Sequence, residues 1–94
     1  MTTIEATPAD DTGTRFSVDV REDDGSSTAH EVTVSDGDWE RFGGGHQSRA
    51  ELVEASFRFL LEREPKESIL RSFELGVIAR YFPEFDETIA RRDT

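Results

Sequence analysis

The sequence predicts an α+β fold, in which an N-terminal antiparallel β-hairpin packs on two to three α-helices in the order ββα-α-α. Two stretches of alternating apolar and polar residues, 14–21 and 28–35, flank a turn sequence and indicate the hairpin. Residues 48–63 carry apolar side chains at helical spacing and indicate the central helix. The chain has 94 residues, enough for one hydrophobic core and one domain.

The N-terminal residues 1–13 precede the first predicted strand. Besides Met1, they contain a single large apolar side chain, that of Ile4. A segment with so little apolar surface to bury does not offset the conformational entropy lost on ordering. We therefore expect residues 1–13 to form a disordered tail and residues 14–94 to form a single α+β domain. The tail also lacks the basic and apolar regions of a signal peptide.

The predicted hairpin has one apolar face and one polar face. Apolar side chains of residues 16–20 alternate with polar ones, and in the second strand His30 lies on the same face as Val32. Between the strands, Asp24 and Gly25 favour a tight turn. A hairpin alone is marginal in water, so we expect its apolar face to cover a helix and His30 to be half-buried with its hydrogen bonds satisfied.

The central helix has start and stop signals in the sequence. Ser48 suits the N-cap, and Glu51 three residues later completes a capping box. Pro65 ends the helix, because the residue before a proline avoids the α region. Residues 36–42 precede it as a short helix, with Asp36 or Asp38 as its cap, and a run of three glycines then breaks the chain.

A third helix is predicted over residues 67–81. Gly76 interrupts its pattern and marks either a close helix–helix approach or a break between two shorter helices. Phe85 and Ile89 would pack back from a final helical turn. The prediction rests on apolar residues that recur at helical spacing, namely Ile69, Leu70, Phe73, Val77, Ile78 and Tyr81.

The charge balance is strongly acidic. The chain has 21 acidic and 11 basic residues, a net charge of −10, and Lys66 is its one lysine. Two interpretations stay open. The composition resembles that of proteins from salt-in halophilic archaea, in which salt screens the repulsion between surface carboxylates. It also fits an acidic protein of a GC-rich bacterium, in which arginine replaces lysine through codon bias. In both cases the field repels nucleic acid and anionic membranes at low salt.

The composition also bounds the location of the protein. There is no cysteine, which fits a reducing compartment. No apolar run approaches the roughly 18 residues of a membrane span. We therefore expect a cytoplasmic protein with no membrane contact.

Residues 31–63 combine an alternating strand (EVTVS), a short helical stretch (DGDWERF), a glycine turn and a longer helix that begins with serine and arginine. This order resembles the ribbon-helix-helix family of DNA-binding proteins and antitoxins. The resemblance implies a dimer in which two such strands pair and read bases through outward side chains, here Glu31, Thr33 and Ser35. Because this strand carries no basic residue, the family is our alternative interpretation.

A second nucleic-acid hypothesis is a helix-turn-helix within residues 67–92, with residues 74–76 as the turn and Arg71 and Arg80 among its phosphate contacts. Acidic residues are interleaved with these arginines, which favours a kinked core helix with a solvated face instead.

The sequence contains no recognisable catalytic, cofactor-binding or metal-binding constellation. His30 and His46 are its two histidines, whereas a zinc site needs three or four ligands at suitable spacing. We therefore expect a small, non-enzymatic binding protein without a cofactor, whose partner is another protein or a second copy in a homodimer. Tyr81, Phe82 and Phe85 are the candidate partner-binding residues, since aromatic side chains concentrate at interface cores. The other interpretation is that these aromatics close the domain.

Overall fold

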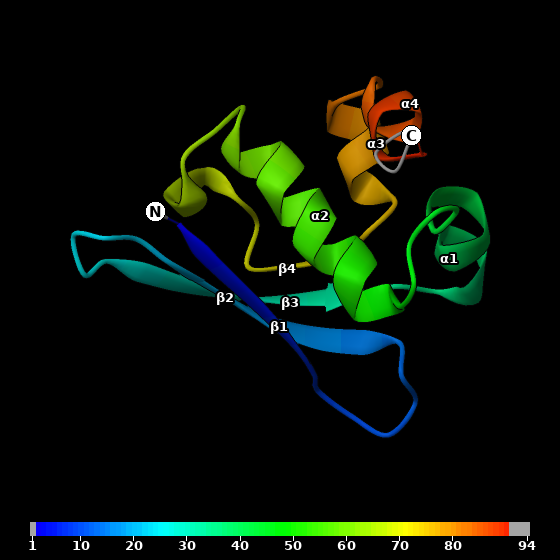
Figure 1. The fold of residues 1–94 in the computed structure, drawn as a ribbon, viewed down its shortest axis with the longest axis horizontal. Coiled ribbons are helices and arrows are strands. Elements are labelled where there is room, and N and C mark those ends of the chain that lie inside the picture. The colour runs from blue at the N-terminus through cyan, green and yellow to red at the C-terminus, as the bar shows by residue number, and fades with distance from the viewer. Residues whose placement is uncertain (1, 91–94) are drawn as a thin grey trace.

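The structure, a computed structural model, describes residues 2–90. Four strands form one sheet in the order β1-β2-β3-β4, and the helices cover one of its faces (Figure 1). The prediction of an α+β fold with antiparallel N-terminal strands is confirmed. Within residues 2–90, however, the fold has four strands and four α-helices, instead of the two strands and two to three helices of the predicted order ββα-α-α. In chain order the elements are β1 Thr3–Pro8, β2 Arg15–Arg21, β3 Ser27–Thr33, α1 Asp36–Phe42, α2 Arg49–Leu61, the 3₁₀ turn η1 Lys66–Ser68, β4 Ser72–Glu74, α3 Val77–Tyr81 and α4 Phe85–Ala90.

The predicted hairpin is present as β2 and β3, which pair antiparallel with Phe16 opposite Val32. The turn between them contains Gly25, whose φ of 89° lies in the left-handed region that favours glycine. The apolar face of the hairpin is buried beneath α2, and its core side chains are Phe16, Val18, Val20 and Val32.

The expectation of a disordered tail over residues 1–13 is wrong for Thr3–Pro8. This segment forms β1, which pairs antiparallel with β2 and places Ile4 opposite Val20. Its two inward side chains, Ile4 and Ala6, pack half-buried against the core under α2. Little apolar surface is enough here, because the free edge of β2 supplies backbone hydrogen bonds to the new strand.

The central helix predicted over residues 48–63 is present as α2, which begins after the predicted N-cap and ends two residues earlier than predicted. The Ser48 hydroxyl accepts from the backbone N–H of Glu51 (3.1 Å), and the helix ends at Leu61, before Pro65. The helix buries most of its side chains, which lie between the sheet and the other helices. They are Leu52, Val53, Ala55, Ser56, Phe57, Phe59 and Leu60.

The short helix α1 also forms over the predicted residues, but its cap is different. The Ser35 hydroxyl, rather than Asp36 or Asp38, occupies the N-cap position and accepts from the Asp38 N–H (3.1 Å). Gly43 ends the helix, and a Cβ at this position would lie 2.5 Å from the Trp39 carbonyl oxygen. A glycine is therefore required for the chain to leave α1 at this point.

The expectation of helix over residues 67–81, as one helix or as two broken at Gly76, is wrong for the residues before Gly76 and holds for α3 after it. The segment forms η1, the parallel edge strand β4 and the separate helix α3. Glu31 N–H donates to the Arg71 carbonyl (2.6 Å) and Leu75 N–H donates to the Thr33 carbonyl (2.9 Å), so the open edge of β3 overrides the local helical pattern. No helix precedes residues 74–76 directly, so the proposed helix-turn-helix is not formed by the part of residues 67–92 that is described.

Gly76 marks a break between elements and also a close approach to α1. It is the N-cap residue of α3, and its N–H donates to the Asp38 carboxylate (3.3 Å). A Cβ on Gly76 would lie 3.0 Å from the same carboxylate. Within residues 2–90, no helix is long and apolar enough to span a bilayer.

Candidate protein-binding groove

A hollow of about 160 Å³ opens on the helix side of the sheet, beside the edge strand β4. We call it the groove. Its three walls are the C-terminal end of α2, the segment that leads into β4, and α3. The lining side chains are Leu60, Glu64, Ser68, Ile69, Leu70, Phe73, Val77, Ile78, Tyr81 and Phe82.

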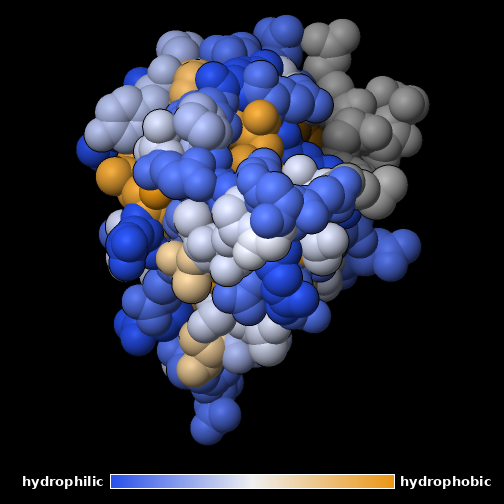
Figure 2. Space-filling view, turned by 90° about the vertical axis from the view of Figure 1, so that its left-hand side faces the viewer, coloured by the Kyte–Doolittle hydropathy of each residue, from blue (hydrophilic) through white to orange (hydrophobic). Residues whose placement is uncertain are grey.

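The groove holds the most exposed apolar side chains of the described chain. Leu70 is 49% exposed and Tyr81 is 68% exposed, and every other large hydrophobic side chain within residues 2–89 is buried or half-buried. In contrast, Leu60, Ile69 and Ile78 form a buried floor. Figure 2, which views the side where α2 ends, shows apolar side chains reaching the surface in its upper half among hydrophilic neighbours. An apolar floor with exposed apolar rims is typical of an interaction surface.

A buried histidine holds the backbone at Leu70. His30 Nδ1 donates to the Leu70 carbonyl oxygen (2.8 Å), so in the neutral ring Nε2 accepts from the Thr28 hydroxyl (2.8 Å). The ring is 5% exposed and also contacts Phe57, with the ring centroids 5.2 Å apart. The expectation that the hydrogen bonds of His30 are satisfied is therefore confirmed, but the side chain is buried and not half-buried as expected. Its hydrogen bond fixes the chain where the Leu70 side chain projects outward.

Among the lining residues that the structure describes, Glu64 is the one with a charged side chain. It is half-buried, and no ion pair to it is made within residues 2–90. The neighbouring Arg63 binds Glu84 instead (Nε to Oε2, 3.1 Å) and lies over the Phe59 ring, 3.6 Å from its centroid. The Glu64 carboxylate is thus available to a cation from outside the described chain.

The structure separates the three aromatic residues that the sequence singled out. Tyr81 and Phe82 line the groove, and Phe82 meets Phe59 edge to face (5.9 Å between centroids). Phe85 is fully buried and contacts Phe42, with the ring centroids 5.1 Å apart. The sequence places Leu70 in a core helix and does not predict its exposure, because that exposure depends on β4, which has no strong local signal. A partner-binding role for Tyr81 and Phe82 stays a prediction.

The main polar cluster outside the groove surrounds Lys66, which is 3% exposed. Its Nζ donates to Glu22 (2.7 Å) and to Glu67 (2.8 Å). These two hydrogen bonds raise the pKa of Lys66 above its usual range, and the bond from Lys66 lowers the pKa of Glu67. The cluster ties η1 to the hairpin and leaves the ammonium group no free role.

The second histidine, His46, lies in the loop before α2 and is 7% exposed. Its Nε2 lies 3.3 Å from the Ile89 carbonyl oxygen, and its Nδ1 lies 3.8 Å from the Glu51 carboxylate. Over residues 2–90 there is no group of three or more histidine, aspartate or glutamate side chains placed to hold a metal ion.

Comparison of the chain with known protein families, with curated proteins and with solved structures gave no match.

Proposed function

We propose that this protein is a small, non-enzymatic binding module whose groove takes an apolar segment of a partner protein. The observation that carries the proposal is the position of Leu70 and Tyr81. These two large apolar side chains are exposed and line the groove, whereas the core side chains of the described residues are buried. Exposed apolar patches of this kind mark interaction sites, and aromatic residues are enriched at the centres of interfaces.

The size of the groove supports a side chain as its occupant. At about 160 Å³ it is close to the roughly 150 Å³ of a cavity that accepts a benzene-sized group. Sites for small molecules enclose about 300–1,000 Å³ and place several polar groups around the ligand. One or two large apolar side chains of a partner would fill the groove.

The charge of the chain supports a separate, basic partner over a second copy. Two molecules that each carry −10 repel one another at low salt, and the same field repels nucleic acid. Glu64 would add a local attraction for a lysine or arginine beside the apolar contact. Association of two copies through the groove would require molar salt to screen their charges.

The alternative proposal is the ribbon-helix-helix-like regulator or antitoxin component that residues 31–63 resemble. It needs the strand around Glu31 to pair with its twin in a dimer. Because β3 pairs with β2 along one edge and with β4 along the other, one of these pairings would have to open. Light scattering on a sizing column at low and at molar salt measures the oligomeric state and tests this alternative. A monomer at both excludes the shared ribbon, and a tight dimer that binds duplex DNA would establish it.

The groove is tested by selecting displayed random dodecapeptides against the full chain. The selected peptides are then measured against a Leu70→Ser/Tyr81→Ser variant and against a Gln47→Ser control, which changes an exposed residue at the opposite end of α2. The proposal predicts at least about tenfold weaker binding to the groove variant, equivalent to about 1.4 kcal/mol, and no change for the control. Failure to select any peptide, or equal binding to all three proteins, would overturn it.

A further inference from the structure

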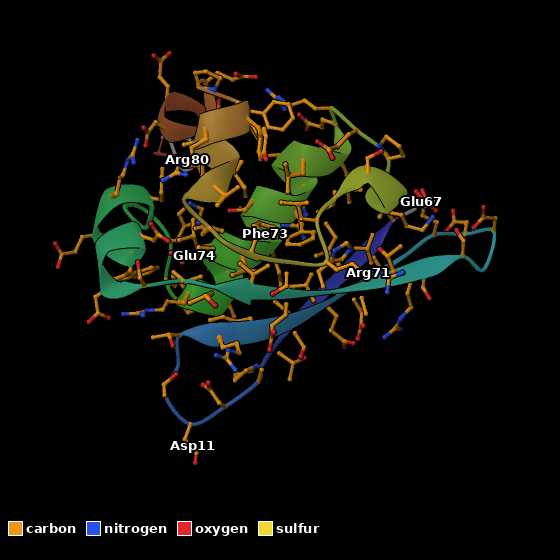
Figure 3. The ribbon with its side chains drawn as sticks, turned by 180° about the vertical axis from the view of Figure 1, so that it is seen from behind. Asp11, Glu67, Arg71, Phe73, Glu74 and Arg80 are labelled. Atoms are coloured by element: carbon orange, nitrogen blue, oxygen red, sulfur yellow. The ribbon has the colours of Figure 1, made fainter. Side chains whose placement is uncertain are left out.

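The outer edge of β4 lies open beside the groove. Arg71 C=O and Leu75 N–H bond to β3, and backbone groups alternate in direction along a strand. The N–H and C=O groups of Ser72 and Glu74 therefore point away from β3. No hydrogen bond on this outer side is made by the part of the chain that the structure describes, and both residues are exposed. Figure 3 looks at this side of the molecule, with Arg71, Phe73 and Glu74 marking the strand.

The groove and this open edge belong to one surface. The Phe73 side chain projects from β4 to the helix side, where its ring centroid lies 6.1 Å from that of Phe57. Phe73 also lines the groove. A chain that paired with the outer edge of β4 would place every second side chain on the same face as Phe73. Those side chains would enter the groove.

We infer that the partner binds as an extended segment that adds a fifth strand to the sheet along β4. Its apolar side chains occupy the groove at alternate positions, and a lysine or arginine of the segment meets the Glu64 carboxylate. Backbone hydrogen bonds to Ser72 and Glu74 would supply affinity, and the groove would supply specificity, as in other cases of strand addition. The inference rests on the proposed function and specifies how that site recognises its partner.

The charge of the site supports a basic segment. Glu64 makes no ion pair within residues 2–90 and lies among mostly apolar lining residues, so its half-buried carboxylate would be stabilised by a cation that the partner supplies. Within residues 2–90 no lysine or arginine lines the groove, so a segment with acidic side chains would meet the Glu64 carboxylate and be repelled by it.

A proline at position 74 separates strand addition from other binding modes. Glu74→Pro removes an outward N–H, and Phe73, the residue before it, already has the extended backbone that precedes proline. The pairing of β4 with β3 is kept, since Leu75 N–H still bonds to Thr33. Glu74→Thr is the matched control, because it loses the same charge and keeps the N–H. The groove-selected dodecapeptides should bind Glu74→Pro at least about tenfold more weakly than Glu74→Thr.

Amide hydrogen exchange tests the same point in the unaltered chain, including the case in which Glu74→Pro fails to fold. Binding of a selected peptide should slow exchange at Ser72 and Glu74 at least about tenfold. The controls are Ile4 and Ala6, whose N–H groups point outward on the other edge strand, since Ala9 N–H bonds inward to Arg15 (2.8 Å). Their exchange should not change.

The outcomes separate this inference from the proposal on which it rests. If peptides bind and depend on Leu70 and Tyr81, but leave the amides of Ser72 and Glu74 unprotected, the partner is not an added strand and the inference is overturned. The groove would still be the binding site. If the selected peptides bind the Leu70→Ser/Tyr81→Ser variant as tightly as the parent chain, the proposed function itself fails. Selected sequences that lack lysine and arginine, or equal binding to Glu64→Gln, would overturn the role of Glu64.

Discussion

The aromatic rings of Phe59 and Phe85 meet edge to face, with their centroids 5.1 Å apart. Phe85 lies as close to Phe42, so a single ring from α4 joins α2 to α1. This contact packs α4 against both α1 and α2. It also removes Phe85 from the surface on which Tyr81 is exposed.

Substitutions at Phe85 and Tyr81 should therefore change the stability of the protein by very different amounts. Phe85→Ala should lower the free energy of unfolding by about 3–5 kcal/mol, because it leaves a cavity between the rings of Phe42 and Phe59. Tyr81→Ser should change it by less than about 0.5 kcal/mol, as expected for an exposed side chain. Urea denaturation followed by circular dichroism measures both. A small loss for Phe85→Ala, or a large one for Tyr81→Ser, would contradict the arrangement of α3 and α4.

The glycines after α1 offer a matched pair of substitutions. A Cβ at Gly43 would lie 2.5 Å from the Trp39 carbonyl oxygen, whereas a Cβ at Gly44 would meet nothing within 4 Å. Gly43→Ala should lower the free energy of unfolding by about 1–3 kcal/mol through overpacking. Gly44→Ala should leave it unchanged or raise it by up to about 1 kcal/mol, because it restricts the unfolded chain. Equal effects of the two substitutions in denaturant unfolding would contradict the close approach of Gly43 to the Trp39 carbonyl at the end of α1.

The buried ammonium of Lys66 should control the titration of Glu67. Because the Lys66 bond lowers the pKa of Glu67 from its usual 4.5, the midpoint of this carboxyl in a carbon-13 NMR titration should lie below 4.5. In Lys66→Met it should return toward 4.5. The Glu84 carboxyl is the internal control, since its own backbone N–H and Arg63 keep its pKa low in both proteins. An unperturbed Glu67 midpoint in the parent protein would refute the pairing.

The same shifts fix the direction of the pH dependence of stability. The pKa of Glu67 is lower in the folded than in the unfolded protein. Its ionised carboxylate therefore stabilises the folded state above pH 4.5, and this stabilisation is lost as the pH falls through the folded pKa. The pKa of Lys66 is higher in the folded than in the unfolded protein. Its ammonium group therefore stabilises the folded state below pH 10.5, and this stabilisation is lost as the pH rises through the folded pKa. The difference in stability between the parent and Lys66→Met should therefore shrink at both extremes.

The acidic composition predicts a strong response to salt. The melting temperature should rise as KCl increases from millimolar to molar, because a Debye length of about 3 Å at 1 M screens the repulsion within a chain of net charge −10. The rise should become smaller at pH 4, where many carboxylates are protonated. A melting temperature that stays flat or falls with KCl at neutral pH would remove the argument for a high-salt environment.

The elements with local signals were predictable from the sequence. Alternation identified the hairpin, and the cap at Ser48 with the stop at Pro65 identified α2. The strands β1 and β4 were not, because each depends on an open edge of the hairpin. Ile4 and Ala6 are too few to predict a strand, and the residues before Gly76 follow a helical pattern that the edge of β3 overrides.

The groove was predictable only in part for the same reason. The aromatic cluster in the sequence predicts a role for Tyr81 and Phe82 in partner binding, and both side chains line the groove. Leu70 and Phe73 line the groove with them because an extended segment that includes β4 replaces the expected helix. The available carboxylate of Glu64 becomes apparent only once Arg63 is seen to bind Glu84. These are tertiary relationships, and the sequence has no local pattern that encodes them.

The most direct test of the groove is a nitrogen-15 NMR titration of the full chain with one of the selected dodecapeptides. We predict that chemical shift changes concentrate at Leu70, Phe73, Val77 and Tyr81 and along the outer edge of β4. Changes centred on α1, or on the face of the sheet that the helices leave uncovered, would contradict the assignment of the groove as the binding site.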